Sequence, residues 1–302
     1  MNQKDRSAFI AIVGRPNVGK SSILNRMLGE KIAIVTNKPQ TTRTRIMGVL
    51  TQGEYQLVFT DTPGMHKART SLGKYMVRSV TESVSGADAC LLVVDSNDPV
   101  SDTERELIDR IKTLGLPAVL AINKTDTLKE KSVLMKVILE YSKLYDFDAI
   151  VPVSAKSGDG MDELIDELKK LCSEGGHFFD EDTLTDQPER QLASEMLREK
   201  LLLSLDKEIP HGTAVVIERM KQREDGLLDI EAVIYCEKDS HKGIIIGKGG
   251  AMLKKVSSKA RADMEHFFDC KVNLQTWVKV KEDWRNRDGL LRNFGFDSSD
   301  FE

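Results

Sequence analysis

The sequence GRPNVGKS at Gly14–Ser21 decides the fold of the first half of this chain. It follows the apolar run Phe9–Val13 (FIAIV), which has the composition of a buried strand, and it precedes a short helical pattern at Ser22–Leu28. A glycine-rich turn ending in Gly-Lys-Ser between a strand and a helix is the pattern of a phosphate-binding loop, because backbone N–H groups and the helix N-terminus can surround a phosphate there. We therefore predict an α/β nucleotide-binding domain.

The residue types in this loop match the chemistry of a nucleoside triphosphate. We expect Lys20 to bridge the β- and γ-phosphates and the Ser21 hydroxyl to ligate Mg²⁺. The backbone N–H groups of the glycine-rich turn would surround the β-phosphate. The predicted nucleotide-binding residues of this loop are Gly14, Asn17, Val18, Gly19, Lys20, Ser21 and Ser22.

Short β-branched runs alternate with helical patterns as far as residue 172. This alternation predicts a mostly parallel sheet with helices on both faces. After Phe9–Val13 the predicted strands are Tyr55–Thr60, Ala89–Val94, Ala118–Ile122 and Ile150–Val153, and the predicted helices are Asp102–Leu114, Lys129–Tyr145 and Met161–Leu171.

A second motif, Asp61-Thr62-Pro63-Gly64, follows the second predicted strand. An acid at a strand end can hold the water shell of Mg²⁺, and the Gly64 N–H can meet the γ-phosphate, so that hydrolysis would release the loop. The polar stretch Lys31–Arg45 has no helical period and contains Thr41 and Thr42, either of which could complete Mg²⁺ coordination; we favour Thr42. Together with Lys20, the residues Thr42, Asp61 and Gly64 form the predicted catalytic set.

Two further motifs point to guanine. Asn123-Lys124-Thr125-Asp126 follows one predicted strand, and Ser154-Ala155-Lys156 follows the next. The Asp126 carboxylate can accept hydrogen bonds from the two adjacent donors of guanine, whereas adenine lacks that donor pair. Ser154, Ala155 and Lys156 would close the base pocket beside Asn123 and Lys124. The motifs together, in this order, predict a GTPase.

Met65 stands where small Ras-like GTPases carry the glutamine that orients the attacking water. A thioether cannot orient a water molecule, and no intrinsic arginine finger is identifiable. We therefore predict slow intrinsic hydrolysis that a partner or a cation raises.

The second half of the chain begins after a segment rich in Gly, Pro and acids, Ser173–Glu189. The predicted organisation is a nucleotide-binding domain at 1–172, a linker at 173–189, a second domain at 190–292 and an acidic tail at 293–302. The second domain reads as helix, strand, strand, short helix, helix and strand. Its longer predicted elements are Arg190–Leu205, Thr213–Met220, Leu228–Cys236, Ala251–Phe267 and Lys271–Val280.

The apolar run and glycine-rich turn at Ile244–Gly250 (IIIGKGG) precede the helix Ala251–Phe267. This order is the pattern of a KH domain, which clamps about four nucleotides of single-stranded RNA. Residues 242–292 carry twelve Lys or Arg against six Asp or Glu, a net charge of +6, while the rest of the chain carries −10. The element order predicts the type II form, and the predicted RNA-binding residues are Gly243, Ile246, Gly247, Lys248, Gly249, Gly250 and Lys254.

Composition limits the remaining classes of function. A chain of 302 residues suggests two domains. No apolar run reaches the roughly 18 residues that a membrane span needs, and the N-terminal segment lacks the shape of a signal peptide. The four cysteines show no C-x-x-C spacing, which argues against a zinc site and fits a reducing compartment. We therefore expect a cytoplasmic protein.

These motifs resemble the Era-like family of bacterial GTPases over nearly the whole chain. The family often has an aliphatic residue where this chain has Met65. The resemblance rests on Gly14–Ser21 (GRPNVGKS), Pro39–Arg43 (PQTTR), Asp61–His66 (DTPGMH), Asn123–Asp126 (NKTD), Ser154–Lys156 (SAK), Glu195–Leu202 (EMLREKLL) and Gly243–Gly250 (GIIIGKGG).

The resemblance implies cofactors and partners that the residues alone do not identify. It implies GTP, GDP and Mg²⁺ as ligands. In related GTPases with an asparagine at the position of Asn17, a potassium ion lies beside the phosphates, so Asn17 becomes a candidate K⁺ ligand. The resemblance also implies binding to the 3′ end of 16S ribosomal RNA, a role in maturation of the 30S subunit, and some peripheral association with the inner membrane. We expect a monomer.

Two other functions fit the same motifs. The chain could be a membrane-associated regulator whose KH fold binds proteins instead of RNA, or a constitutive RNA-binding protein with a structural nucleotide. The first predicts no RNA binding, and the second predicts no nucleotide turnover.

Overall fold

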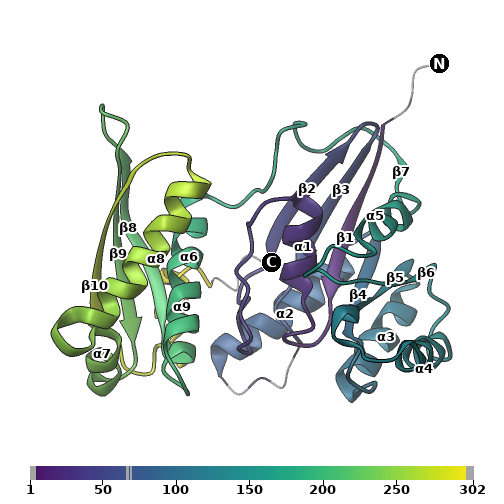
Figure 1. Ribbon diagram of the computed structural model, residues 1–302, viewed down its shortest axis with the longest axis horizontal. Coiled ribbons are helices and arrows are strands. Elements are labelled where there is room, and N and C mark those ends of the chain that lie inside the picture. The colour runs from purple at the N-terminus through teal and green to yellow at the C-terminus, as the bar shows by residue number, and fades with distance from the viewer. Residues whose placement is uncertain (1–4, 66–67, 69, 297–302) are drawn as a thin grey trace. The chain divides into compact units, whose positions relative to one another are not determined.

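The computed structural model describes residues 5–65, 68 and 70–296 (Figure 1). The chain forms two compact units: Met1–Lys67 with Met76–Asp186, and Ala68–Tyr75 with Gln187–Glu302. His66, which belongs to one of the motifs above, and tail residues 297–302 lie outside the described residues.

The first unit contains a seven-stranded sheet, in the order β2-β3-β1-β4-β5-β6 with β7 paired to β1. Strands β1, β3, β4, β5 and β6 run parallel, whereas β2 is antiparallel to β3 and β7 is antiparallel to β1. The strands are β1 (Arg6–Val13), β2 (Ile46–Gln52), β3 (Tyr55–Asp61), β4 (Ala89–Asp95), β5 (Ala118–Asn123), β6 (Ala149–Pro152) and β7 (Ser173–Glu174).

Helices cover both faces of this sheet, as strands that are apolar on both sides require. Helices α1 (Lys20–Leu28) and α5 (Met161–Lys169) contact each other and β3. The opposite face packs against α2 (Ser71–Ser85), α3 (Asp102–Leu114) and α4 (Lys131–Ser142), whose buried side chains form one cluster with alternate residues of β1, β4 and β5. The parallel strands therefore end at one edge, and the residues that follow β1, β3, β5 and β6 meet there.

Besides the two-residue strand β7, two elements of this unit were not predicted from the sequence. Strand β2 pairs along its whole length with β3, from Ile46 opposite Asp61 to Gln52 opposite Tyr55. Helix α2 starts ten residues after the end of β3. Both lie beside polar stretches in which the sequence pattern indicates no regular element.

Residues 173–186, most of the predicted linker, pack onto the first unit. The Gln56 side chain accepts hydrogen bonds from the Phe178 and Phe179 N–H groups at 2.7 and 3.0 Å. The Val49 N–H donates to the Leu184 carbonyl oxygen at 2.9 Å. The segment thus lies along the β2–β3 hairpin. Its Gly- and acid-rich composition does not indicate this ordered packing.

The second unit is a three-stranded sheet with helices on one face. Strand β9 (Leu228–Cys236) lies in the centre, antiparallel to β8 (Ala214–Gln222) and parallel to β10 (Val272–Val280). Helices α6 (Glu189–Ser204), α7 (Asp239–Ile246) and α8 (Ala251–Phe267) bury their apolar residues against the same face. A last helix, α9 (Asp288–Asn293), follows β10. The element order is the one predicted for a type II KH domain.

Candidate functional site

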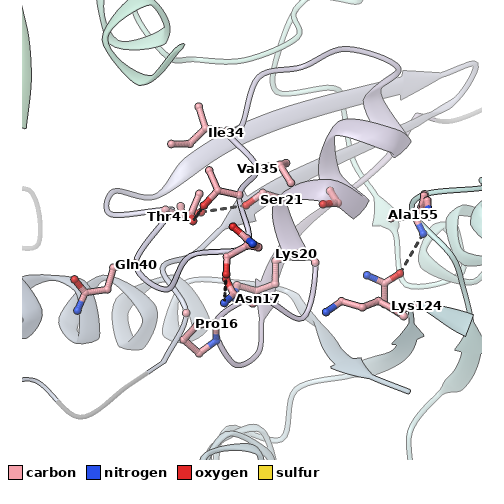
Figure 2. Close-up of a pocket in the computed structure, with 18 of the residues that line it drawn as sticks. Pro16, Asn17, Lys20, Ser21, Ile34, Val35, Gln40, Thr41, Lys124 and Ala155 are labelled. Carbon is pink, nitrogen blue, oxygen red and sulfur yellow. Dashed lines mark hydrogen bonds between the residues drawn. The ribbon is translucent and has the colours of Figure 1, made fainter. Parts of the chain in front are cut away.

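A cavity of about 690 Å³ lies at the carboxyl edge of the first sheet, between the phosphate loop, the 34–42 loop and the loops after β5 and β6 (Figure 2). Four predicted nucleotide-binding residues, Gly14, Val18, Asp61 and Ser154, are buried behind its walls. The other predicted residues of the first domain line it: Asn17, Gly19, Lys20, Ser21, Ser22, Thr42, Gly64, Asn123, Lys124, Asp126, Ala155 and Lys156.

Lys20 lies across the phosphate loop. Its Nζ donates to the Gly14 carbonyl oxygen at 3.1 Å and to the Arg15 carbonyl oxygen at 3.0 Å. Burial lowers its pKa to about 8, although the charge of Asp61 opposes the shift. The ammonium is thereby fixed at the mouth of the loop, where a β–γ phosphate bridge requires it.

Ser21, Thr42 and Asp61 converge on one point. The Ser21 hydroxyl donates to Asp61 Oδ2 at 2.6 Å and lies 3.0 Å from the Thr42 hydroxyl. Thr41 is placed differently, since its hydroxyl donates to the Lys38 carbonyl oxygen at 2.6 Å. This geometry favours Thr42 over Thr41 as the metal ligand.

The donor set at this point suits Mg²⁺. Among the described residues, Asp61 Oδ1 is buried without a hydrogen-bond partner. Burial raises the pKa of Asp61 to about 6, against the lowering effects of Lys20, Ser21 and the Thr62 N–H. A buried, unsatisfied carboxylate oxygen next to two hydroxyls is a hard-oxygen site that a divalent cation would satisfy.

Asn123 joins the phosphate side of the cavity to its base side. Its Nδ2 donates to the Val18 carbonyl oxygen at 2.8 Å, and its Oδ1 accepts the Ala155 N–H at 3.1 Å. Gly19 has φ of 101°, and a Cβ there would come within 2.2 Å of the Asn123 amide nitrogen. A glycine is therefore needed at position 19, both for the positive φ and because a larger side chain would clash with Asn123.

Asp126 is oriented by the loop that follows β6. The Ser154 hydroxyl donates to Asp126 Oδ1 at 2.8 Å, and Lys156 Nζ lies 3.9 Å from Oδ2. The Asp126 side chain is 21% exposed, so the carboxylate remains available to a base. The carboxylate therefore faces the cavity as guanine recognition requires.

The last residue of β4 and the residue after it also hold the guanine motif, and they were not predicted from the sequence. Asp95 pairs with Lys124 Nζ at 2.6 Å, and Ser96 donates to the Lys124 carbonyl oxygen at 3.1 Å. Burial acts to raise the pKa of Asp95, but hydrogen bonds from Lys124 and Asn97 outweigh it and lower the pKa. The available signal was an acid at a strand end, the same signal that identified Asp61.

Asn17 and Met65 take contrasting positions. Asn17 lines the cavity and donates from Nδ2 to the Asn37 carbonyl oxygen at 3.1 Å. Met65 is partly buried against the core cluster under α2, α3 and α4. Its side chain thus packs against protein and offers no hydrogen bond to a water.

The glycine-rich turn of the second unit lies between α7 and α8. Gly243, Lys248, Gly249 and Lys254 are exposed, and Ile246, Gly247 and Gly250 are half-buried. Next to the turn is a cavity of about 340 Å³ between α8 and β10. It is lined by Gly250, Leu253, Lys254, Ser257, Ser258, Arg261, Leu274 and Thr276. Of the predicted RNA-binding residues, Gly250 and Lys254 reach this cavity, and the others form the turn or the preceding helix.

Comparison with known protein families gives one match in each half of the chain. A model described as a 50S ribosome-binding GTPase matches residues 9–124, and a KH domain model matches residues 208–285.

Curated relatives match nearly end to end. GTPase Era of Ruminiclostridium cellulolyticum is 50% identical over 291 residues, which is 96% of this chain and 97% of that protein. GTPase Era of Clostridioides difficile is 48% identical, over 96% of this chain and 98% of its own.

Two solved structures are similar over both units, each with a TM-score of 0.93, 37% identity, and coverage of 97% of this chain and 99% of the other. One is a variant of Aquifex aeolicus Era bound to GDP and AlF₄⁻. The other is Era in complex with MgGDPNP and nucleotides 1506–1542 of 16S ribosomal RNA.

Proposed function

The chain belongs to the Era family of GTPases, and on that premise we propose that it is a GTP-controlled clamp for the 3′ end of 16S ribosomal RNA that acts in assembly of the 30S subunit. The protein is a GTPase that uses GTP, GDP and Mg²⁺. The proposal concerns what the second unit binds and how the nucleotide controls it.

The conformation of Gly249 carries the RNA-binding part of the proposal. Its φ is 58°, and a Cβ added there would meet no protein atom within 4 Å. A steric clash within the protein is therefore not the reason that residue 249 is a glycine. A left-handed backbone in open space lets a sugar–phosphate chain approach closely, which is the use of this turn in KH domains.

The surroundings of the turn suit a polynucleotide. Lys254 and Arg261 supply positive charge at the cavity beside it, and Lys248 is exposed in the turn itself. Leu253 and Leu274 give the same cavity apolar walls on which a base can rest. Cations for the backbone and an apolar surface for bases are the two requirements of single-strand binding.

On the nucleotide side, each residue has a role that its geometry supports. Ser21 and Thr42, with Asp61 behind them, would hold Mg²⁺, which would supply positive charge that stabilises the phosphates in the reaction. Lys20 binds the phosphates, and Asp126 reads guanine. Because Met65 packs against the core, nothing at that position orients a water, and we infer that intrinsic hydrolysis is slow.

The loops that contain Thr42 and Gly64 are the elements that a γ-phosphate can order. Both residues line the cavity. A ligand shifts a conformational equilibrium only through different contacts in the two states, and a γ-phosphate contact at Gly64 is present with GTP and lost with GDP. We infer that this difference controls the RNA affinity of the second unit.

Binding of a labelled 3′-terminal segment of 16S ribosomal RNA tests the proposal. We expect the GTP-analogue form to bind it more tightly than a scrambled RNA of the same length and composition. Gly249→Asp should lose this binding, because it adds a strained side chain and a negative charge where the phosphates approach. Gly226→Asp is the matched control: Gly226 also has positive φ and open space around it, but lies in the β8–β9 turn.

If the RNA bound equally well to the Gly249→Asp protein, or if the wild type preferred no sequence, the RNA part of the proposal would be wrong. The GTPase would remain, and a protein-binding role for the second unit would become the better account.

Membrane association and a monomeric state are further parts of this proposal. In residues 5–65, 68 and 70–296, no helix is long and apolar enough to cross a membrane. Co-flotation with anionic phospholipid vesicles tests the peripheral association, and sedimentation equilibrium tests the monomer.

A further inference from the structure

We propose that Arg15 is a positioning residue for GTP binding and hydrolysis. Its side chain is anchored by Glu104, in the first turn of α3, and by Asp98, in the loop before that helix, and this anchor holds the phosphate loop and Lys20 in place. The inference concerns the nucleotide site of the first unit and does not depend on RNA binding.

The Arg15 side chain is directed away from the nucleotide cavity. Its Nε donates to Glu104 Oε1 at 2.8 Å and its Nη2 to Asp98 Oδ2 at 3.1 Å. Arg15 is not among the residues that line the cavity, although Pro16 and Asn17, which follow it, both are. A guanidinium held by two carboxylates outside the site cannot act as an arginine finger, so any effect on the reaction passes through the backbone.

The Glu104 end of this anchor is rigid. The Glu104 side chain has no exposed surface, and Oε2 accepts the Ser101 N–H at 2.8 Å. The Ser101 hydroxyl in turn accepts the Glu104 N–H at 3.4 Å, which completes a capping box at the start of α3. Tyr141 of α4 lies against the same carboxylate; burial and this negative charge both raise the tyrosine pKa.

The backbone of Arg15 is bonded directly to one predicted catalytic residue and adjoins another. Its carbonyl oxygen accepts a hydrogen bond from Lys20 Nζ at 3.0 Å. The next residue, Pro16, is so close to Gly64 that a Cβ on Gly64 would come within 2.7 Å of the proline Cα. A shift of Arg15 would therefore move both the lysine that binds phosphate and the glycine predicted to sense it.

Loss of Arg15 should have two separate effects, one on the stability of the fold and one on the position of the phosphate loop. Glu104 is fully buried. Removing the Arg15 charge leaves this buried carboxylate without the positive charge of the guanidinium, which lowers the stability of the folded protein. Replacing Glu104 as well removes that charge but does not restore the anchor. The two effects of losing Arg15, on stability and on loop position, can therefore be separated by a second substitution.

The experiment compares full-length wild type, Arg15→Gln, and Arg15→Gln with Glu104→Gln. The control is Arg110→Gln, which removes an arginine of α3 that donates to the Thr81 carbonyl oxygen at 3.2 Å and the Ser85 hydroxyl at 2.8 Å, away from the cavity. Affinities for GDP and for guanosine are measured by competition with a fluorescent guanine nucleotide. Thermal unfolding is followed in parallel, and GTP hydrolysis is measured in single turnovers.

We expect Arg15→Gln to weaken GDP binding and to slow hydrolysis by about 10- to 100-fold, because a misplaced catalytic group costs that much. Affinity for guanosine, which has no phosphate, should change less than about twofold by the same argument. The double variant should recover the unfolding temperature and keep the GDP defect. Arg110→Gln should resemble the wild type in both affinities.

Equal losses for GDP and guanosine, or recovery of GDP affinity together with stability in the double variant, would show that Arg15 only stabilises the fold. Unchanged GDP binding and hydrolysis in Arg15→Gln would also overturn the inference. Failure of the wild type itself to bind GDP would instead overturn the assignment of the site.

Discussion

The Ser154 hydroxyl donates to Oδ1 of Asp126 at 2.8 Å, and this bond joins the two motifs that follow β5 and β6. The carboxylate keeps its other oxygen for a ligand, with Lys156 Nζ 3.9 Å away. A carboxylate held at one oxygen cannot rotate freely, so it presents fixed acceptors to the base. We therefore propose that guanine recognition in this protein depends on a pair of residues 28 positions apart in the chain.

Asp126→Asn should change the base that the site prefers. An amide offers a donor where guanine also presents donors, so GDP affinity should fall by roughly 10³-fold or more, while xanthosine diphosphate should bind better than it binds to the wild type. Competition binding with both diphosphates measures the change. Asp162→Asn, the same exchange in the first turn of α5 and outside the cavity lining, is the control. GDP affinity that survives in Asp126→Asn would show that the base is read elsewhere.

Asp61 makes the nucleotide- and Mg²⁺-free protein sensitive to pH. Burial raises the pKa of Asp61 to about 6 from 3.8, so the folded protein binds this proton more tightly than the unfolded chain. The stability gained from that proton is complete below the unfolded pKa and is lost as the pH rises through 6. Between pH 5 and 7, the wild type should lose about 1 kcal/mol more than Asp61→Asn.

Urea unfolding of both proteins at the two pH values, with EDTA and without nucleotide, measures this difference. The same pH slope in both proteins would mean that the Asp61 pKa is ordinary and that the site is better solvated than the structure shows.

Potassium should accelerate hydrolysis if Asn17 helps to hold a cation beside the phosphates. Single-turnover GTP hydrolysis in potassium and sodium buffers of equal ionic strength measures the effect, and we expect a rate increase of about tenfold or more with potassium, since one added positive charge at the phosphates acts as an arginine does. Asn17→Ala should lose the difference while still binding GDP. Equal rates in the two cations for the wild type would remove Asn17 from the metal-binding residues.

The two tryptophans of the second unit should differ sharply in their effect on stability. Trp284 has no exposed surface and donates from Nε1 to the Gly212 carbonyl oxygen at 2.9 Å, whereas Trp277 is 42% exposed on β10. Trp284→Ala should cost about 3–5 kcal/mol in the free energy of unfolding, and Trp277→Ala about 0.5 kcal/mol. Denaturant unfolding checks both, and similar costs for the two would contradict this difference in burial.

The sequence predicted the elements with strong periodicity very closely. Strand β9 and helices α3 and α8 have the bounds predicted for them, because alternating or 3.6-residue apolar patterns show which side of an element is buried. The nucleotide motifs were equally readable, since their residue types follow from the chemistry of phosphate, Mg²⁺ and guanine. The pattern alone also predicted that these motifs meet, because parallel strands end at one edge.

Other features depend on contacts that no local pattern encodes. Strand β2 was missed because its polar surroundings hide a pairing that only β3 supplies. The packing of residues 173–186 depends on hydrogen bonds to Gln56, more than 120 residues earlier. The Arg15–Glu104 pair joins residues 89 positions apart, and the burial of Glu104 at the start of α3 could not be foreseen from an acid in a first helical turn.

The most direct test of the central claim is the ratio of RNA affinities in the two nucleotide states. The wild type is loaded with a non-hydrolysable GTP analogue or with GDP, each with Mg²⁺, and titrated with the 3′-terminal segment of 16S ribosomal RNA at fixed salt. A GTP-controlled clamp requires tighter binding with the analogue, by about fivefold or more for a typical coupling of 1–3 kcal/mol. Equal affinity in the two states would mean that the protein binds RNA without GTP control, and the proposed clamp would be wrong.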